Sequence, residues 1–83
     1  MSKWCLYILK CNDSSYYTGI TNDLEKRVAD HQNGKGAKYT RGRGPLILVY
    51  TENHPDRSSA TKKEIFIKKL SRSQKKALIN NQN

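Results

Sequence analysis

The chain has 83 residues and a formal net charge of +9, because sixteen Lys and Arg residues face only seven Asp and Glu residues. This length predicts a single domain, residues 1–83, and excludes a large enclosed ligand cavity. No apolar stretch approaches the roughly 20 residues of a membrane-spanning helix, and the N-terminus lacks the apolar segment of a secretory signal. The charge excess predicts an anionic partner, with nucleic acid as the first candidate and an anionic membrane as the second.

Apolar runs and turn signals predict strands and helices in the order β-β-α-β-α-α. Strands are expected at residues 3–11, 16–20 and 46–51, and the first and third are apolar on both faces. Helices are expected at residues 23–32, 58–70 and 72–80, capped by Asn22 with Glu25, by Ser58 or Ser59, and by Ser71 with Gln74. We therefore expect an α+β fold, ordered from about residue 3 to 79, in which a small three-stranded sheet with a β-hairpin and a central first strand is flanked by about three helices.

The two cysteines, Cys5 and Cys11, fall in the first predicted strand. Six residues of extended chain separate them by roughly 20 Å, far beyond disulfide reach. The chain has no Cys-x-x-Cys pair and only two histidines, which argues against a zinc site. The sequence thus predicts a reduced, cytoplasmic protein.

Five side chains could carry chemistry. Tyr7 and Tyr17 fall on the two strands of the predicted hairpin, where they can be neighbours on one face. Arg27 and His31 are four residues apart on the following helix, and Glu64 is an isolated acid in a basic stretch of the next helix. Taken one at a time, these residues are also explained by packing, by a solvated helix face and by a helical ion pair.

The spacing of these residues is more specific. Cys5-Leu6-Tyr7 stands where the GIY triplet of the GIY-YIG nucleases belongs, and Tyr17-Thr18-Gly19 stands where their YIG triplet belongs. Arg27 follows eight residues after Gly19, His31 comes one helical turn later, and Glu64 matches the acidic residue of the family's later helix. From Trp4 to about Leu78, the chain resembles this family, in particular its small stand-alone bacterial members, which are related to the incision subunit of nucleotide excision repair.

The chain departs from the family pattern at several positions. Cys5 replaces the first Gly of GIY and Thr18 replaces the middle Ile of YIG. Ile20 stands where some relatives carry a Lys near the phosphate. Many relatives also have a late Asn in the site; Asn80 is the nearest candidate here, and we do not assign it to the site.

The resemblance implies a metal-dependent endonuclease that hydrolyses phosphodiester bonds in DNA, in the setting of DNA repair or recombination. Glu64 is the expected ligand of one Mg²⁺ or Mn²⁺ ion, and the Arg27 guanidinium offers a planar fork to a phosphate. The resemblance also implies that Tyr7 or Tyr17 takes the proton from water, without indicating which, and His31 would orient that group or relay its proton.

Residues 34–45 form a predicted loop with four glycines, one proline and no acid. Its cations and its tyrosine are expected to contact nucleic-acid phosphates without sequence preference; they are Lys35, Lys38, Tyr39, Arg41 and Arg43. An alternative is a non-catalytic DNA- or RNA-binding module on the same scaffold, since the charge supports both functions equally. The complete set of tyrosines, arginine, histidine and glutamate favours the enzyme, because a pure binder needs no isolated acid in a basic surface.

Overall fold

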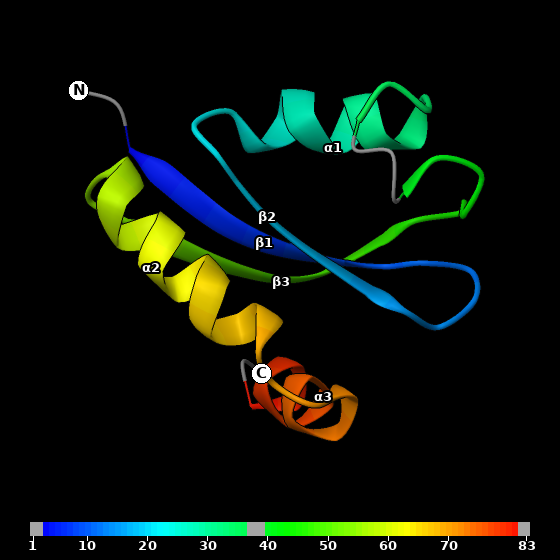
Figure 1. Ribbon diagram of the computed structural model, residues 1–83. Helices are drawn as coiled ribbons and strands as arrows, with labels where there is room; N and C mark the ends of the chain where they lie inside the picture. The colour runs from blue at the N-terminus through cyan, green and yellow to red at the C-terminus, as the bar shows by residue number, and fades with distance from the viewer. Residues whose placement is uncertain (1–2, 37–39, 82–83) are drawn as a thin grey trace.

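The computed structural model describes residues 3–36 and 40–81. Its elements follow the predicted order: β1 (Trp4–Lys10), β2 (Tyr16–Thr21), α1 (Leu24–Gln32), β3 (Ile47–His54), α2 (Arg57–Lys68) and α3 (Arg72–Asn80) (Figure 1). The predicted α+β class is confirmed. Within the described residues, no helix is long and apolar enough to span a bilayer.

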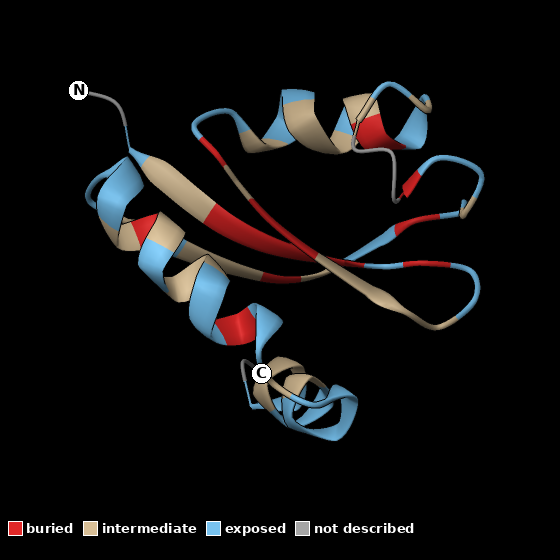
Figure 2. Ribbon diagram, in the orientation of Figure 1, coloured by how far each residue is buried: buried red, intermediate tan, exposed pale blue. Residues whose placement is uncertain are grey.

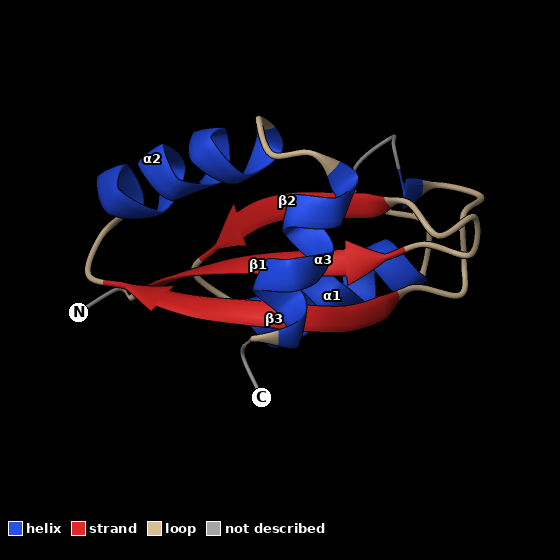
Figure 3. Ribbon diagram, turned by 90° about the horizontal axis from the view of Figure 1, so that it is seen from below, coloured by secondary structure: helices blue, strands red, loops and turns tan. Residues whose placement is uncertain are grey.

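The strands form one antiparallel sheet in the order β2-β1-β3, so β1 is central, as its two apolar faces predict (Figure 3). Helix α1 covers one face of the sheet, and α2 and α3 lie on the other (Figure 1). The register of the hairpin sets Tyr7 directly opposite Gly19. Alternate residues of β1 therefore face different helices, and Tyr7 belongs to the face covered by α1.

Two apolar clusters lie on the two faces of the sheet. On the side of α2 and α3, the buried residues are Leu6, Ile8, Tyr50 and Ile67. On the side of α1 they are Leu9, Cys11 and Leu46, with Tyr17 and Val28 packed against them. Figure 2 shows that the buried residues concentrate along the strands, so the sheet carries most of the core.

Several element boundaries differ from the sequence-based expectations. Asp23 replaces Asn22 as the cap of α1, because the Asp23 N–H bonds to the Thr21 hydroxyl and its own carboxylate accepts from the Lys26 N–H. Asp56 caps α2 in place of a serine, since its carboxylate accepts the Ser59 N–H at 2.8 Å. The capping box of α3 is confirmed.

Strand β3 runs to His54, three residues beyond its predicted end at residue 51. The apolar pattern stops at that position, but the backbone remains paired with β1 as far as the Trp4–His54 pair. Polar residues are tolerated here because β3 is an edge strand. Helix α2 ends at Lys68, two residues before the predicted end.

Candidate active site

Tyr7 lies at the centre of the sheet and is only 1% exposed. Its ring passes directly over Gly19 of the neighbouring strand. A Cβ atom at residue 19 would lie 2.5 Å from the Tyr7 hydroxyl oxygen and 2.7 Å from Cζ, closer than real contacts allow. Because Gly19 has no side chain, it leaves room for the Tyr7 ring to lie across β2; this is the opening in β2.

His31, in the last turn of α1, forms a hydrogen bond with the Tyr7 hydroxyl. The distance from His31 Nε2 to Tyr7 Oη is 2.9 Å, and the distance from His31 Nδ1 to Thr40 Oγ1 is 2.8 Å. His31 is 2% exposed, and Gly36 packs so closely on its ring that a Cβ there would lie 2.2 Å from Nδ1. Thr40 and Gly36 both belong to the loop of residues 34–45, called the basic loop below. This loop therefore fixes the orientation of the imidazole ring.

Tyr17 completes a group of three aromatic rings. The centroid of the Tyr17 ring lies 6.4 Å from that of Tyr7 and 5.2 Å from that of His31. The centroids of the Tyr7 and His31 rings are 5.7 Å apart. Tyr17 is half-buried and lines a surface hollow of about 330 Å³, whereas Tyr7 and His31 are almost fully buried. Of these three rings, Tyr17 therefore reaches the open surface.

Arg27 and Glu64 act on the Tyr7 hydroxyl from two different helices. Burial raises the pKa of Tyr7 to about 12; the hydrogen bond and charge of Arg27 oppose this rise, while the charges of Tyr17 and Glu64 add to it. The pKa of His31 is lowered, first by burial and then by the charge of Arg27, with a smaller opposing effect of Asp30. Both Tyr7 and His31 are therefore neutral at neutral pH.

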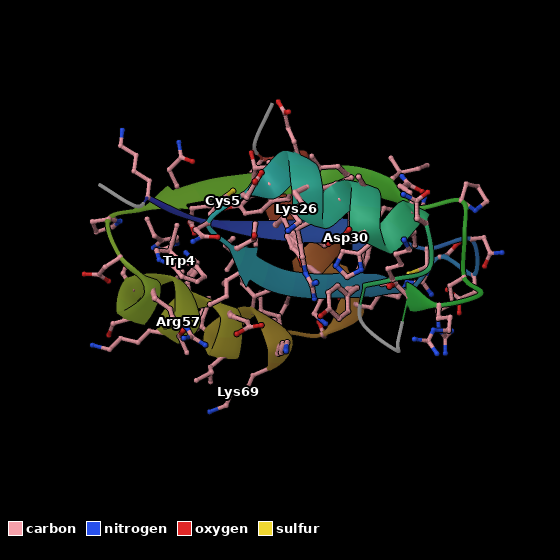
Figure 4. All side chains as sticks on the ribbon, turned by 90° about the horizontal axis from the view of Figure 1, so that it is seen from above. Trp4, Cys5, Lys26, Asp30, Arg57 and Lys69 are labelled. Carbon is pink, nitrogen blue, oxygen red and sulfur yellow. The ribbon has the colours of Figure 1, made fainter. Side chains whose placement is uncertain are left out.

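In Figure 4, seen from above, α1 and α2 lie on either side of β2. Glu64 of α2 is 20% exposed and pairs with Lys68 at 3.2 Å. Of the five side chains that the sequence singles out as catalytic, the structure packs the rings of Tyr7, Tyr17 and His31 together, and Arg27 and Glu64 lie close enough for their charges to shift the pKa of Tyr7.

Glu64 is the candidate ligand for the expected metal ion. No group of three or more His, Cys, Asp or Glu side chains that could hold a metal ion occurs within residues 3–36 and 40–81. A single carboxylate fits Mg²⁺, which keeps several water ligands and is often held by only one or two protein carboxylates. The donor set of this site is therefore compatible with one such ion on Glu64.

The basic loop (residues 34–45) makes several contacts within the protein. Lys35 and Arg41 are exposed, but Arg43 pairs with Asp13 of the β1–β2 turn. Asn12 ties the same segment down, because its side-chain amide donates to the Gly44 carbonyl at 2.7 Å. Lys38 and Tyr39 lie outside the described residues.

Two loop residues that contact the site were missed by the sequence analysis: Gly36 and Thr40. Their positions depend on how the loop folds back onto α1, and no local sequence pattern indicates this.

The structure also shows where three positions that depart from the family pattern, or were left unassigned, lie. Ile20 packs against the apolar cluster of α2 and α3, and Asn80 is exposed in the last turn of α3. Thr18 is buried, and its hydroxyl has no hydrogen-bond partner within the described part of the chain.

Comparison with known proteins identifies the scaffold. The sequence profile of the GIY-YIG catalytic domain matches residues 3–77. The chain belongs to the GIY-YIG family. Membership in this nuclease family supports a nuclease-like function and a nucleic-acid substrate.

Several proteins resemble the chain over most of their length. A UPF0213 protein of Clostridium perfringens is 60% identical over 74 residues, which are 89% of this chain and 80% of the relative. A UPF0213 protein of Halobacterium salinarum is 52% identical over 73 residues, or 88% and 95% of the two chains. The solution structure of a UPF0213 protein from Bacillus halodurans shares 47% identity and a TM-score of 0.62, covering 94% of this chain and 83% of the other. A solution structure from E. faecalis has 41% identity and a TM-score of 0.68, with coverages of 98% and 86%.

Proposed function

We propose that this GIY-YIG protein is a metal-dependent endonuclease that hydrolyses phosphodiester bonds in DNA. The observation that carries the proposal is the buried hydrogen bond between Tyr7 and His31, flanked by the cation of Arg27 and the carboxylate of Glu64. Cleavage of a phosphodiester needs a group that takes a proton from water and positive charge on the phosphate. Side chains suited to both tasks meet at this one place.

Arg27 and Glu64 would stabilise negative charge in different ways. Arg27 would bind a phosphate oxygen through its planar guanidinium, which is suited to two parallel hydrogen bonds. Glu64 would hold one Mg²⁺ or Mn²⁺ ion with its carboxylate. When bound, such an ion supplies positive charge to the phosphate and to the leaving oxygen.

The two tyrosines differ in access to water. Tyr7 is 1% exposed and has a pKa of about 12, so its hydroxyl stays protonated and serves to hold the rings in place. Tyr17 lines the surface hollow and lies against the neutral His31 ring. Tyr17 is therefore the better placed of the two to meet an attacking water, with Tyr7 and His31 as positioning residues.

Replacement of one carboxylate tests the proposal. Glu64→Gln keeps the shape of the side chain, so the fold and DNA binding should stay within a few-fold of the parent. Cleavage of branched, duplex or single-stranded DNA with Mg²⁺ or Mn²⁺ should be lost, as it should be for the parent in EDTA. The matched control is Glu25→Gln, which removes an exposed carboxylate from the first turn of α1 and should leave cleavage unchanged.

Two outcomes would contradict the proposal. Undiminished cleavage by Glu64→Gln would make this carboxylate structural. A parent protein that binds all three DNAs but cleaves none with either metal would instead be a non-catalytic nucleic-acid-binding module. As the setting of the proposed activity, we assign DNA repair or recombination in the reducing cytoplasm, in keeping with the free thiols of Cys5 and Cys11.

A further inference from the structure

Two surface hollows lie next to each other beside the proposed site and share Tyr16. The first, of about 330 Å³, is lined by both neighbouring tyrosines and by Thr18, Lys68 and Lys75. The second, of about 700 Å³, is lined by the hairpin and by the start of α3, with Lys10, Ser14, Ser71, Arg72, Ser73 and Lys76. Because Tyr16 lines both, the two hollows adjoin at this residue, one bordered by Tyr17 and the other by the start of α3; we refer to the two together as the depression.

The lining of this depression is strongly basic. It contains five cations, and no Asp or Glu is found among its described lining residues. Lys68 pairs with Glu64, which links the depression to the proposed metal ligand. For the other four cations, no carboxylate of the described residues lies within ion-pair distance. Their charge is therefore available to a ligand.

The fold fixes the backbone from which these cations project. Helix α3 packs its Leu78 and Ile79 against the apolar cluster that also contacts Tyr16. Arg72 and Lys76 are four residues apart on this helix, so they share one face, and both are exposed. Lys10 is paired with Tyr16 in the hairpin register and faces them from the other side of the hollow.

Among the described residues of the basic loop, Lys35 and Arg41 are exposed, whereas Arg43 is paired with Asp13. We propose that the backbone of the nucleic-acid substrate runs from Tyr17 along the joined hollows and over the first turn of α3, rather than mainly over the basic loop. This inference rests on the proposed function, since it assumes that the strand cleaved at Tyr17 is the one that occupies the hollows. The contacts are to phosphates, so they add affinity without sequence preference.

The test measures binding in EDTA, where no cleavage is expected. Fluorescence anisotropy at several salt concentrations gives the slope of log K against log salt for single-stranded and duplex DNA. The double variant Arg72→Gln/Lys76→Gln should lower the magnitude of this slope by about 0.7 for each lost contact on a single strand and about 0.9 for each on a duplex. Circular dichroism and thermal melting confirm that the variant is folded.

Two further variants serve as comparisons. Lys3→Gln/Lys62→Gln removes the same charge from exposed residues that line neither hollow, and its slope should equal that of the parent. Lys35→Gln/Arg41→Gln removes two cations of the loop, and its slope should change less than that of the Arg72→Gln/Lys76→Gln variant. An unchanged slope in the α3 variant, or an equal change in the Lys3→Gln/Lys62→Gln control, would overturn the inference.

The binding test separates this inference from the proposed activity. A parent protein that cleaves DNA while the α3 variant keeps the parent slope would refute the hollow as the strand-binding surface and leave the nuclease intact. A parent that fails to cleave, but whose slope falls in the α3 variant, would support the binding surface and refute the nuclease.

Discussion

Gly19→Ala tests whether the Tyr7 ring depends on the opening in β2. The new methyl group would lie 2.5, 2.7 and 3.0 Å from Tyr7 Oη, Cζ and Cε2, whereas ordinary contacts begin at 3.4 Å. The ring cannot swing aside freely, because it is fully buried and its hydroxyl is bonded to His31. Overpacking of this kind costs about 1–3 kcal/mol, and loss of the hydrogen bond adds about 1 kcal/mol.

Urea denaturation measures this loss, and in a domain of this size each kcal/mol lowers Tm by about 4–8 °C. The matched control is Gly44→Ala, because a Cβ there meets no atom within 4 Å, so no clash arises and stability should change by no more than about 1 kcal/mol. In a Tyr7→Leu background, the added methyl group of Gly19→Ala should cost much less, since the clashing ring atoms are gone. Cleavage should fall by about 10²-fold from the displaced hydroxyl. A Gly19→Ala protein as stable and active as the parent would refute this reasoning.

The tyrosine hydroxyls give two further predictions. Tyr17→Phe should lower the single-turnover rate of cleavage by about 10²-fold, while DNA binding persists; a parental rate would remove Tyr17 from the chemistry. For Tyr7, the folded-state pKa of about 12 exceeds the unfolded value of 10, so its contribution to stability is complete below pH 10 and is lost as the pH rises through 12. The loss is at most about 3 kcal/mol. Urea titrations between pH 9 and 12 should show that Tyr7→Phe flattens this alkaline decline, and an equal decline in both proteins would contradict the assigned pKa.

The sequence predicts the three-stranded sheet well, because its strands follow from local apolar periodicity. The five candidate side chains come from four different elements, and only their spacing, which resembles that of the GIY-YIG family, singles them out. The apolar runs on both faces of β1 require cover on both sides, which makes this strand central. The four-residue step from Arg27 to His31 places both on neighbouring turns of α1 whatever the rest of the fold does. These patterns can be recognised in the sequence even where the conformation of the loops is unknown.

The basic loop shows where this reasoning stops. Its glycines and cations indicate a surface segment, yet Thr40 and Gly36 of this loop hold the His31 ring. Asp13 of a distant turn likewise pairs with Arg43. These contacts join residues far apart in sequence through a segment without periodicity, so only the folded chain reveals them.

The packing of Tyr7 and His31 has a consequence for natural variation in such small proteins. Both side chains are among the largest fully buried ones in the described residues, so the residues proposed for chemistry also fill the interior. A substitution that abolishes activity there will usually lower expression as well, and the two effects will be confused in any genetic screen. Loss of activity without loss of protein would therefore have to begin at the partly exposed members, Tyr17, Arg27 and Glu64.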